Sequence, residues 1–164
     1  MRELTQVRDA VISALERAGM TTLVAFPAQS VKNYSGAVAT VSVSTAESKT
    51  MGFCNYLGEE YDEAAGTMRE LYGKQLEGDI TVEVRAEKAA DCENGCAVVA
   101  DVLLSGLPFG IHSGELRWEE LKWEKTTDMF LRRGSLRCQA VFTARTGEDG
   151  ETFLDFTLRG VMKH

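Results

Sequence analysis

Two histidines are the only imidazoles in this 164-residue chain, and a serine or cysteine nucleophile would depend on one of them as its base. His112 lies in a glycine-flanked turn, Gly110-Ile111-His112-Ser113-Gly114, and His164 stands at the chain end. A histidine in such a turn is usually solvated, and chain ends are usually poorly ordered. The Gly-x-Ser-x-Gly turn that presents a catalytic serine is absent. The sequence therefore predicts no nucleophilic enzyme.

Four acids crowd one short stretch of the chain: Glu59, Glu60, Asp62 and Glu63. Clustered carboxylates could hold a hard cation, which needs several oxygen ligands. The spacing of a calcium-binding loop is missing, however, and acidic runs usually form a solvated surface. Glycines on both sides favour a loop that wraps a sheet edge. We therefore predict neither a metal site nor an acid–base pair here.

Of the four cysteines, only Cys92 and Cys96 lie close together, at a spacing that supplies half of a zinc site. No second pair follows at a suitable distance. The opening Met1-Arg2-Glu3-Leu4 lacks the apolar core of a signal peptide, so we expect no export and reduced thiols. Both cysteines are predicted to be free and without metal.

The charge balance is acidic, with 18 Lys and Arg against 25 Asp and Glu and a net charge of −7. Nucleic-acid binding relies on cations that neutralise phosphates, so such a chain is a poor general binder. No glycine-rich phosphate loop follows a predicted strand. No apolar run approaches the roughly 20 residues of a membrane helix. We expect no cofactor, no sequence-specific nucleic acid and no membrane partner.

The segment from residue 115 to 137 mixes two tryptophans with six cations and five acids, a net of +1. Aromatics among cations can stack bases and hold phosphates, but the acids in the same stretch oppose that use. Tryptophan and arginine are enriched at protein interfaces. The composition favours a protein contact surface, with plain core or surface residues and nucleic acid as the alternatives.

Two segments carry helical periodicity. Residues 4–18 place apolar side chains at every third or fourth position, and Gly19 provides a stop. A second, more apolar helix is predicted over about 95–105, with Asn94 as its N-cap and Gly106 after it.

Much of the remaining chain alternates with the period of a strand, most clearly over 37–44 and 79–86. Further strands are predicted at 22–26, 49–56, 114–125, 129–144 and 152–162. Gly147-Glu148-Asp149-Gly150 indicates a hairpin between the last two. Residues 68–72 fit a strand or one helical turn equally well.

The order of elements is helix, several strands, helix and a closing set of strands, which predicts an α+β fold. We expect a mainly antiparallel β-sheet with two helices packed on one face, and a partly polar second face. The length suits one domain over residues 1–164, with 44% hydrophobic and 26% charged residues.

Three segments carry a family resemblance: Leu4-Thr5-Gln6-Val7-Arg8-Asp9-Ala10-Val11 at the start, and Asp128-Met129-Phe130-Leu131-Arg132-Arg133-Gly134-Ser135-Leu136-Arg137 and Phe153-Leu154-Asp155-Phe156-Thr157-Leu158-Arg159-Gly160 near the end. With the strand-rich middle between them, the chain resembles bacteriophage tail-assembly proteins encoded in prophages, in particular tail terminator or tail completion proteins. The resemblance spans most of the chain as a pattern of elements, and no single position matches a diagnostic signature.

This resemblance implies a structural role without catalysis and with no catalytic residues to transfer. Such proteins form a ring, commonly a hexamer, that caps the finished tail tube, stops its growth and presents a surface for the head connector. The location implied is the virion tail, with assembly in the cytoplasm of the bacterial host. Another neck or head–tail joining protein would show the same pattern. A small-ligand-binding or enzymatic α+β domain with an unrecognised pocket is the competing class.

A closed ring needs one surface patch that meets a different patch on the next subunit. We expect one patch in the 115–137 segment and the other in the 57–70 loop, with the acids of one copy opposite Arg132 or Arg133 of the next. Exposed ion pairs contribute only about 0–1 kcal/mol each, so apolar contacts must supply most of the affinity. The predicted interface residues are Glu59, Glu60, Asp62, Glu63, Trp118, Trp123, Met129, Arg132 and Arg133.

Overall fold

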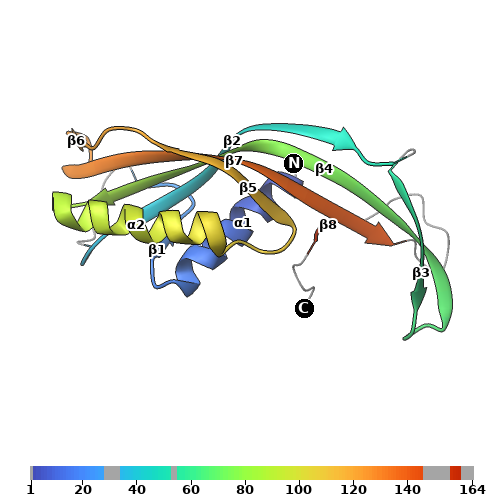
Figure 1. Cartoon of the computed structure of the whole chain (residues 1–164). Coiled ribbons are helices and arrows are strands. Elements are labelled where there is room, and N and C mark those ends of the chain that lie inside the picture. The colour runs from blue at the N-terminus through green and yellow to red at the C-terminus, as the bar shows by residue number, and fades with distance from the viewer. Residues whose placement is uncertain (1, 28–33, 53–54, 146–155, 160–164) are drawn as a thin grey trace.

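The structure is a computed structural model that describes residues 2–27, 34–52, 55–145 and 156–159. Its elements, in chain order, are α1 (Arg2–Arg17), β1 (Thr21–Leu23), β2 (Val38–Thr50), β3 (Tyr56–Asp62), β4 (Thr67–Ala86), α2 (Ala89–Ser105), β5 (Ile111–Trp118), β6 (Lys122–Glu124), β7 (Met129–Arg145) and β8 (Thr157–Leu158). The predicted α+β class is confirmed, because all the strands form one sheet and both helices lie on the same side of it (Figure 1).

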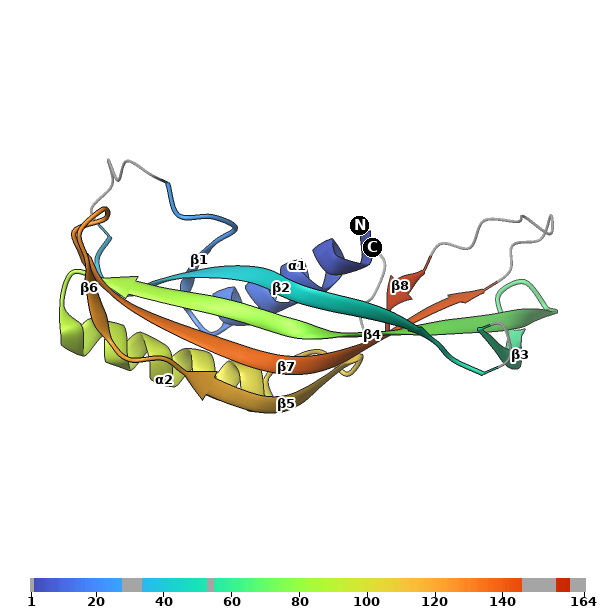
Figure 2. The same ribbon diagram turned by 90° about the horizontal axis from the view of Figure 1, so that it is seen from above.

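The sheet has the order β1-β2-β4-β7-β5, with β3 beside β4 and with β6 and β8 beside β7 (Figure 2). Every pairing is antiparallel except that of β1 with β2. The prediction of a mainly antiparallel sheet is therefore confirmed. The strands β4 and β7 form its spine, paired from Leu71↔Arg145 to Ala86↔Phe130.

The core lies between the sheet and the two helices. Every second residue of β4 points to the helices, and Ile80, Val82 and Val84 are fully buried there. Because residues directly opposite each other in an antiparallel pair share a face, Leu136 of β7 lies beside Ile80 in the same layer. The helices add these buried residues: Val7, Val11 and Leu15 from α1, and Cys92, Cys96, Val99 and Leu103 from α2.

The two ends of the described chain are joined by one side chain. Gln6 of α1 donates from its Nε2 to the carbonyl oxygen of Phe156 at 2.9 Å, and its Oε1 accepts from the backbone N–H of Leu158 at 2.8 Å. Leu158 is 2% exposed and belongs to the core. The short strand β8, which pairs with β7 at Phe142, is thus fastened to α1 as well.

The strands β3, β4 and β7 continue past the helices as an arm, made of residues 56–72 and 143–145 (Figure 1). The prediction of a loop over 57–70 is wrong, because β3 and the start of β4 form an antiparallel hairpin there. Tyr61 and Met68 stand opposite each other on it and are 58% and 57% exposed. No described helix covers either face of this hairpin, so it has no buried side. Its sequence therefore lacks the apolar alternation from which a strand could be predicted.

Three predicted strand boundaries are also wrong. The predicted strand 49–56 includes the end of β2 at Thr50 and the start of β3 at Tyr56, while 68–72 and 79–86 belong to the single strand β4. Gly78 lies inside β4 where a Cβ would stand 2.3 Å from the carbonyl oxygen of Thr45, so this close approach of two strands requires glycine. The predicted strand 114–125 is divided into β5 and β6.

The helix α2 begins at Ala89, six residues before the predicted start, and Asn94 lies inside it. Its N-cap is Lys88, whose side chain makes no capping hydrogen bond, so no cap residue marks this start in the sequence. Gly95 lets the helix approach the sheet, because a Cβ there would stand 2.5 Å from the Cβ of Ala37.

The predicted strand 22–26 is shorter than expected, since β1 covers only Thr21–Leu23. The hairpin predicted at residues 147–150 lies outside the described residues, as does most of the strand predicted at 152–162. Among the described helices, none combines the length and the apolar character needed to cross a membrane.

Candidate subunit interface

The face of the sheet away from the helices, here called the open face, carries rows of paired charges. Glu83 of β4 and Arg133 of β7 are directly opposite, as are Asp79 and Arg137. The ion pairs of this face include Lys49–Glu77 (2.7 Å), Arg137–Asp79 (3.8 Å), Arg133–Glu83 (2.6 Å), Arg85–Glu83 (3.0 Å), Arg85–Glu124 (3.0 Å) and Arg145–Glu60 (2.8 Å). The expectation of a partly polar second face is met, and its charges largely neutralise one another.

The arginines of this face hold their acids in the charged form. Burial by itself raises the pKa of Glu83, but the hydrogen bond from Arg133 and the charge of Arg85 outweigh it, so the pKa lies below the ordinary 4.5. The hydrogen bond from Arg85 is the main reason that the pKa of Glu124 is also lowered. Arg85 itself is only 7% exposed, which makes this pair the most enclosed of the row.

These pairs predict acid sensitivity. A carboxyl group with a lowered folded-state pKa stabilises the fold above its unfolded pKa, and that stability is lost as the pH falls through the folded value. We expect the free energy of unfolding to fall as the pH drops below about 4.5, and less steeply in the double variant Glu83→Gln/Glu124→Gln. Urea unfolding between about pH 7 and about pH 3.5 measures this slope.

The matched control is Glu16→Gln, which removes an exposed acid from α1, away from the open face. Because an exposed charge contributes little to stability, the variant should keep the slope of the parent chain. A double variant with the parent slope would contradict the assignment of acid sensitivity to the open face.

The predicted interface residues lie in two groups at opposite ends of the sheet. The acids of the 59–63 stretch belong to the arm, and the tryptophans and arginines lie at the β5–β6 end (Figure 1). Glu60 is bonded to Arg145, and Asp62 contacts Arg69 at 2.8 Å and accepts from two backbone N–H groups in the turn. Two of the four predicted acids are thus already engaged within the chain.

The cations expected to meet these acids are engaged as well. Arg133 is bonded to Glu83, and Arg132 donates to the carbonyl oxygen of Glu119 at 2.9 Å. Met129 is 4% exposed, so it packs inside its own subunit.

Of the two tryptophans at this end, Trp123 is exposed and Trp118 is half-buried. Trp123 is 48% exposed and packs edge-on against Phe130 at a centroid distance of 4.9 Å. Trp118 lies under the guanidinium of Arg132, and its ring would be 2.8 Å from a Cβ at Gly134. The two tryptophans therefore give the β5–β6 end an aromatic surface on the helix side of the sheet.

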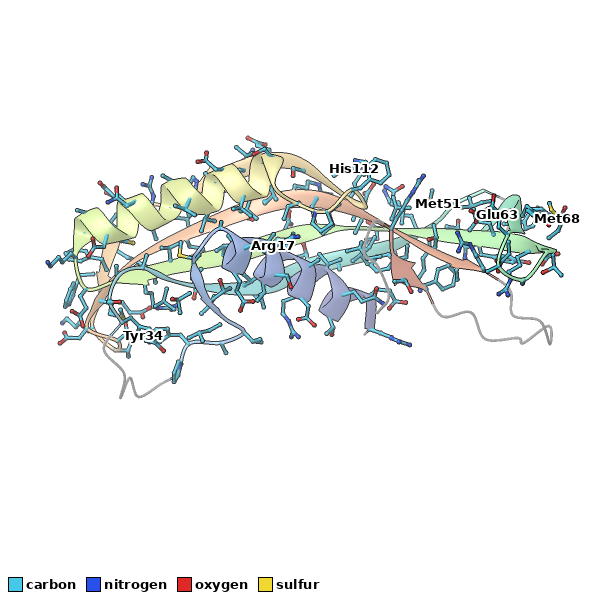
Figure 3. The ribbon with its side chains drawn as sticks, turned by 90° about the horizontal axis from the view of Figure 1, so that it is seen from below. Arg17, Tyr34, Met51, Glu63, Met68 and His112 are labelled. Carbon is cyan, nitrogen blue, oxygen red and sulfur yellow. The ribbon has the colours of Figure 1, made fainter. Side chains whose placement is uncertain are left out.

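The groups that could have formed a catalytic site do not converge. His112 lies on β5, whereas Glu63 is at the tip of the arm, well away from it (Figure 3). In the described part of the chain, no three His, Cys, Asp or Glu side chains come together as a metal site would require.

The cysteines of the described chain pack as buried thiols. Cys92 donates from its thiol to the carbonyl oxygen of Val84 at 3.4 Å. Its hydrogen bond with Cys96, together with burial, raises the pKa of the Cys96 thiol. Burial raises the pKa of Cys138 to about 11. The hydrogen bond with Cys96 lowers the pKa of Cys92. Because their pKa values are raised, Cys96 and Cys138 stay protonated near neutral pH and are weak nucleophiles.

The sequence did not reveal that the sheet ends in two long edges. Beyond its three-residue pairing with β1, β2 has only β4 beside it among the described strands, and β5 has only β7. All residues from Ser44 to Thr50 are exposed, and so are His112–Glu115. Because no described strand pairs with these stretches, both are surfaces on which another strand can pair.

No protein-family model and no curated protein matches this chain. The chain is similar to one chain of a solved structure described as the virion of a native gene transfer agent (GTA) particle. The two share 17% sequence identity, the match covers 84% of this chain and 96% of that chain, and the TM-score is 0.44.

Proposed function

We propose that this protein is a structural protein of bacteriophage particles that caps the tail tube as a ring, ends tail polymerisation and forms the surface for head–tail joining. The observation that carries this proposal is the arm, which extends beyond the helices and has no core of its own. Its exposed large apolar side chains are Tyr56, Leu57, Tyr61 and Met68. Exposed apolar patches mark surfaces that bind other proteins.

The distribution of exposed apolar groups supports contact between unlike patches. The arm occupies one end of the sheet, and β6, which carries the exposed Trp123, lies at the other (Figure 2). A contact between two different patches repeats from copy to copy, and it closes into a ring when the rotation between copies divides a full turn. The family resemblance favours such a ring, commonly a hexamer, in contact with the tail tube and with head-completion proteins in the virion.

We also propose that the protein is not an enzyme. His112 and the acids of the arm are apart, so the acid–base pair that they could have supplied is not assembled (Figure 3). The arginines that could have held an anionic substrate on the open face are bonded to acids, as Arg133 is to Glu83. This favours a structural role over the alternative of a small-ligand-binding or enzymatic domain.

Electron microscopy of tails assembled with and without the protein tests the proposal. We expect overlong tails without heads when the protein is missing. Tails of normal length that fail to join heads would instead identify another neck or head–tail joining protein. Tails that keep their normal length and still join heads would contradict both assignments.

The arm is tested in the same assay by the double variant Tyr61→Ser/Met68→Ser. Because both side chains are more than half exposed, the variant should fold and yet fail to cap tails. The matched control is Val98→Ser/Leu104→Ser, which removes two exposed apolar side chains from α2, at 37% and 55% exposure. The control should cap tails normally, and equal loss in both variants would show that the arm has no special role.

A further inference from the structure

We propose that the β2 edge of one copy pairs with the β5 edge of the next, so that the sheets of neighbouring copies join into one. The pairing is antiparallel, with Glu47 opposite Arg117 and Lys49 opposite Glu115. This inference rests on the proposed ring and names the contact that closes it. The occupant of each edge is therefore a second copy of this chain.

The strand directions permit this contact between copies in the same orientation. β2 is antiparallel to β4, β4 to β7, and β7 to β5, so β2 and β5 of one copy run in opposite directions. A copy rotated about an axis along the strands therefore brings its β5 antiparallel to the β2 of its neighbour. Both open faces then point to the same side, as a ring requires.

The charges on the two edges are complementary in this register. Lys49 lies on the open face, where it contacts Glu77 at 2.7 Å, and Glu47 is two residues away on the same side. On β5, Glu115 and Arg117 are bonded to each other at 3.0 Å, again two residues apart. Because the strands are antiparallel, the order of signs is reversed on one of them, and each charge meets its opposite.

Other registers are disfavoured. A slip by two residues in one direction places Lys49 opposite Arg117 and Glu47 opposite Glu119, both pairs of like charge. A slip by two in the other direction places Glu47 opposite Glu115. A slip by one turns every side chain of one strand to the wrong face. The edges thus select one register.

The helix side of the same register matches small residues with large ones. Ala46 of β2 falls opposite Trp118, and Ser48 falls opposite Leu116, whose side chain is half-buried. Large side chains opposite small ones interdigitate without a clash. Farther along β2, an indentation lined by Leu4, Thr5, Arg8, Val24, Val41, Ser42 and Val43 lies beside the edge.

The exposed Trp123 of the neighbour's β6 is directed toward this indentation. β6 follows β5 along the same side of β7, so it would lie next to residues 41–43 of β2, between Thr45 and the three residues that pair with β1. Leu4, Val24, Val41 and Val43 give this indentation an apolar part, and an aromatic side chain in such a pocket is a frequent centre of a protein interface. The contact then has an apolar anchor in addition to its charges.

Disulfide cross-linking with the full chain tests the register. Residues directly opposite in an antiparallel pair have Cα atoms about 4.5–5.5 Å apart, within the range that a disulfide spans. Oxidation of Glu47→Cys/Arg117→Cys should yield covalent oligomers up to the ring. The slipped pair Glu47→Cys/Glu119→Cys should yield at least about tenfold less, because its sulfur atoms are too far apart. The parent chain and each single variant give the background.

The mass of the unmodified assembly, measured by native mass spectrometry, separates the outcomes. If rings are present but the matched cysteine pair cross-links no better than the slipped pair, this register is wrong while the ring itself stands. Rings in which neither pair links would contradict edge pairing altogether. A chain that stays monomeric and does not cap tails would overturn both this inference and the proposed function.

Discussion

Replacing Phe142 with alanine is expected to lower the free energy of unfolding by about 3–5 kcal/mol, the usual cost of removing a large buried aromatic side chain. Phe142 is fully buried and is the largest such side chain among the described residues. It lies on β7, where β4 and β8 flank it on either side at Lys74 and Leu158. The cavity left by alanine would therefore weaken the contact of three strands with the core.

Urea unfolding measures this loss, with Gln139→Ala as the control. Gln139 is on the same strand but is exposed on the open face, where it donates to Glu77 at 3.0 Å. An exposed hydrogen bond contributes little, so the control should lose less than about 1 kcal/mol. Similar losses in the two variants would show that the stability of the core does not depend on the Phe142 side chain.

If the proposed ring forms through the β2 edge, replacing Ala46 with lysine is expected to weaken its assembly at least about tenfold, or about 1.4 kcal/mol per contact. Ala46 is exposed in the subunit, so the monomer should keep its stability. In the proposed pairing, however, the lysine would lie opposite Trp118 and bring a long charged side chain into the contact. Lysines on edge strands are a common way in which proteins prevent sheets from joining.

Analytical ultracentrifugation over a range of concentrations measures this effect. The control is Ala97→Lys, which adds the same side chain at an exposed site on α2. Assembly of the control should equal that of the parent chain. If Ala46→Lys assembles as well as the control, the β2 edge is not part of the contact.

Sequence periodicity predicted those elements that have one buried side. The stripe of residues 4–18 gave α1, and the alternation of 79–86 gave the central part of β4, because both pack against the core. The arm was missed since neither of its sides is covered and its acids suggested a loop. The sequence also did not predict that β4 continues through Gly73 and Gly78. A glycine in a sequence usually indicates a break, and only the structure shows that close neighbouring atoms leave no room for a side chain at these two positions.

The candidate interface was only partly accessible from the sequence. Composition pointed to the tryptophans of the 115–137 segment, and Trp123 is indeed exposed. The partners of the arginines were not predictable, because the bond between Arg133 and Glu83 depends on the register of β4 against β7. The two sheet edges were invisible for the same reason, since an edge is defined by the strand order and not by the residues of one strand.

The hydrogen bonds between Gln6 and residues Phe156 and Leu158 have a consequence for how the chain folds during its synthesis. They join residues about 150 positions apart, so α1 leaves the ribosome long before its last partners are made. Contacts so distant along the chain form late in folding. A nascent or truncated chain would lack the strand that fastens α1, and its exposed apolar surface would be open to proteases. Degradation of unfinished copies would then keep defective subunits out of the assembly.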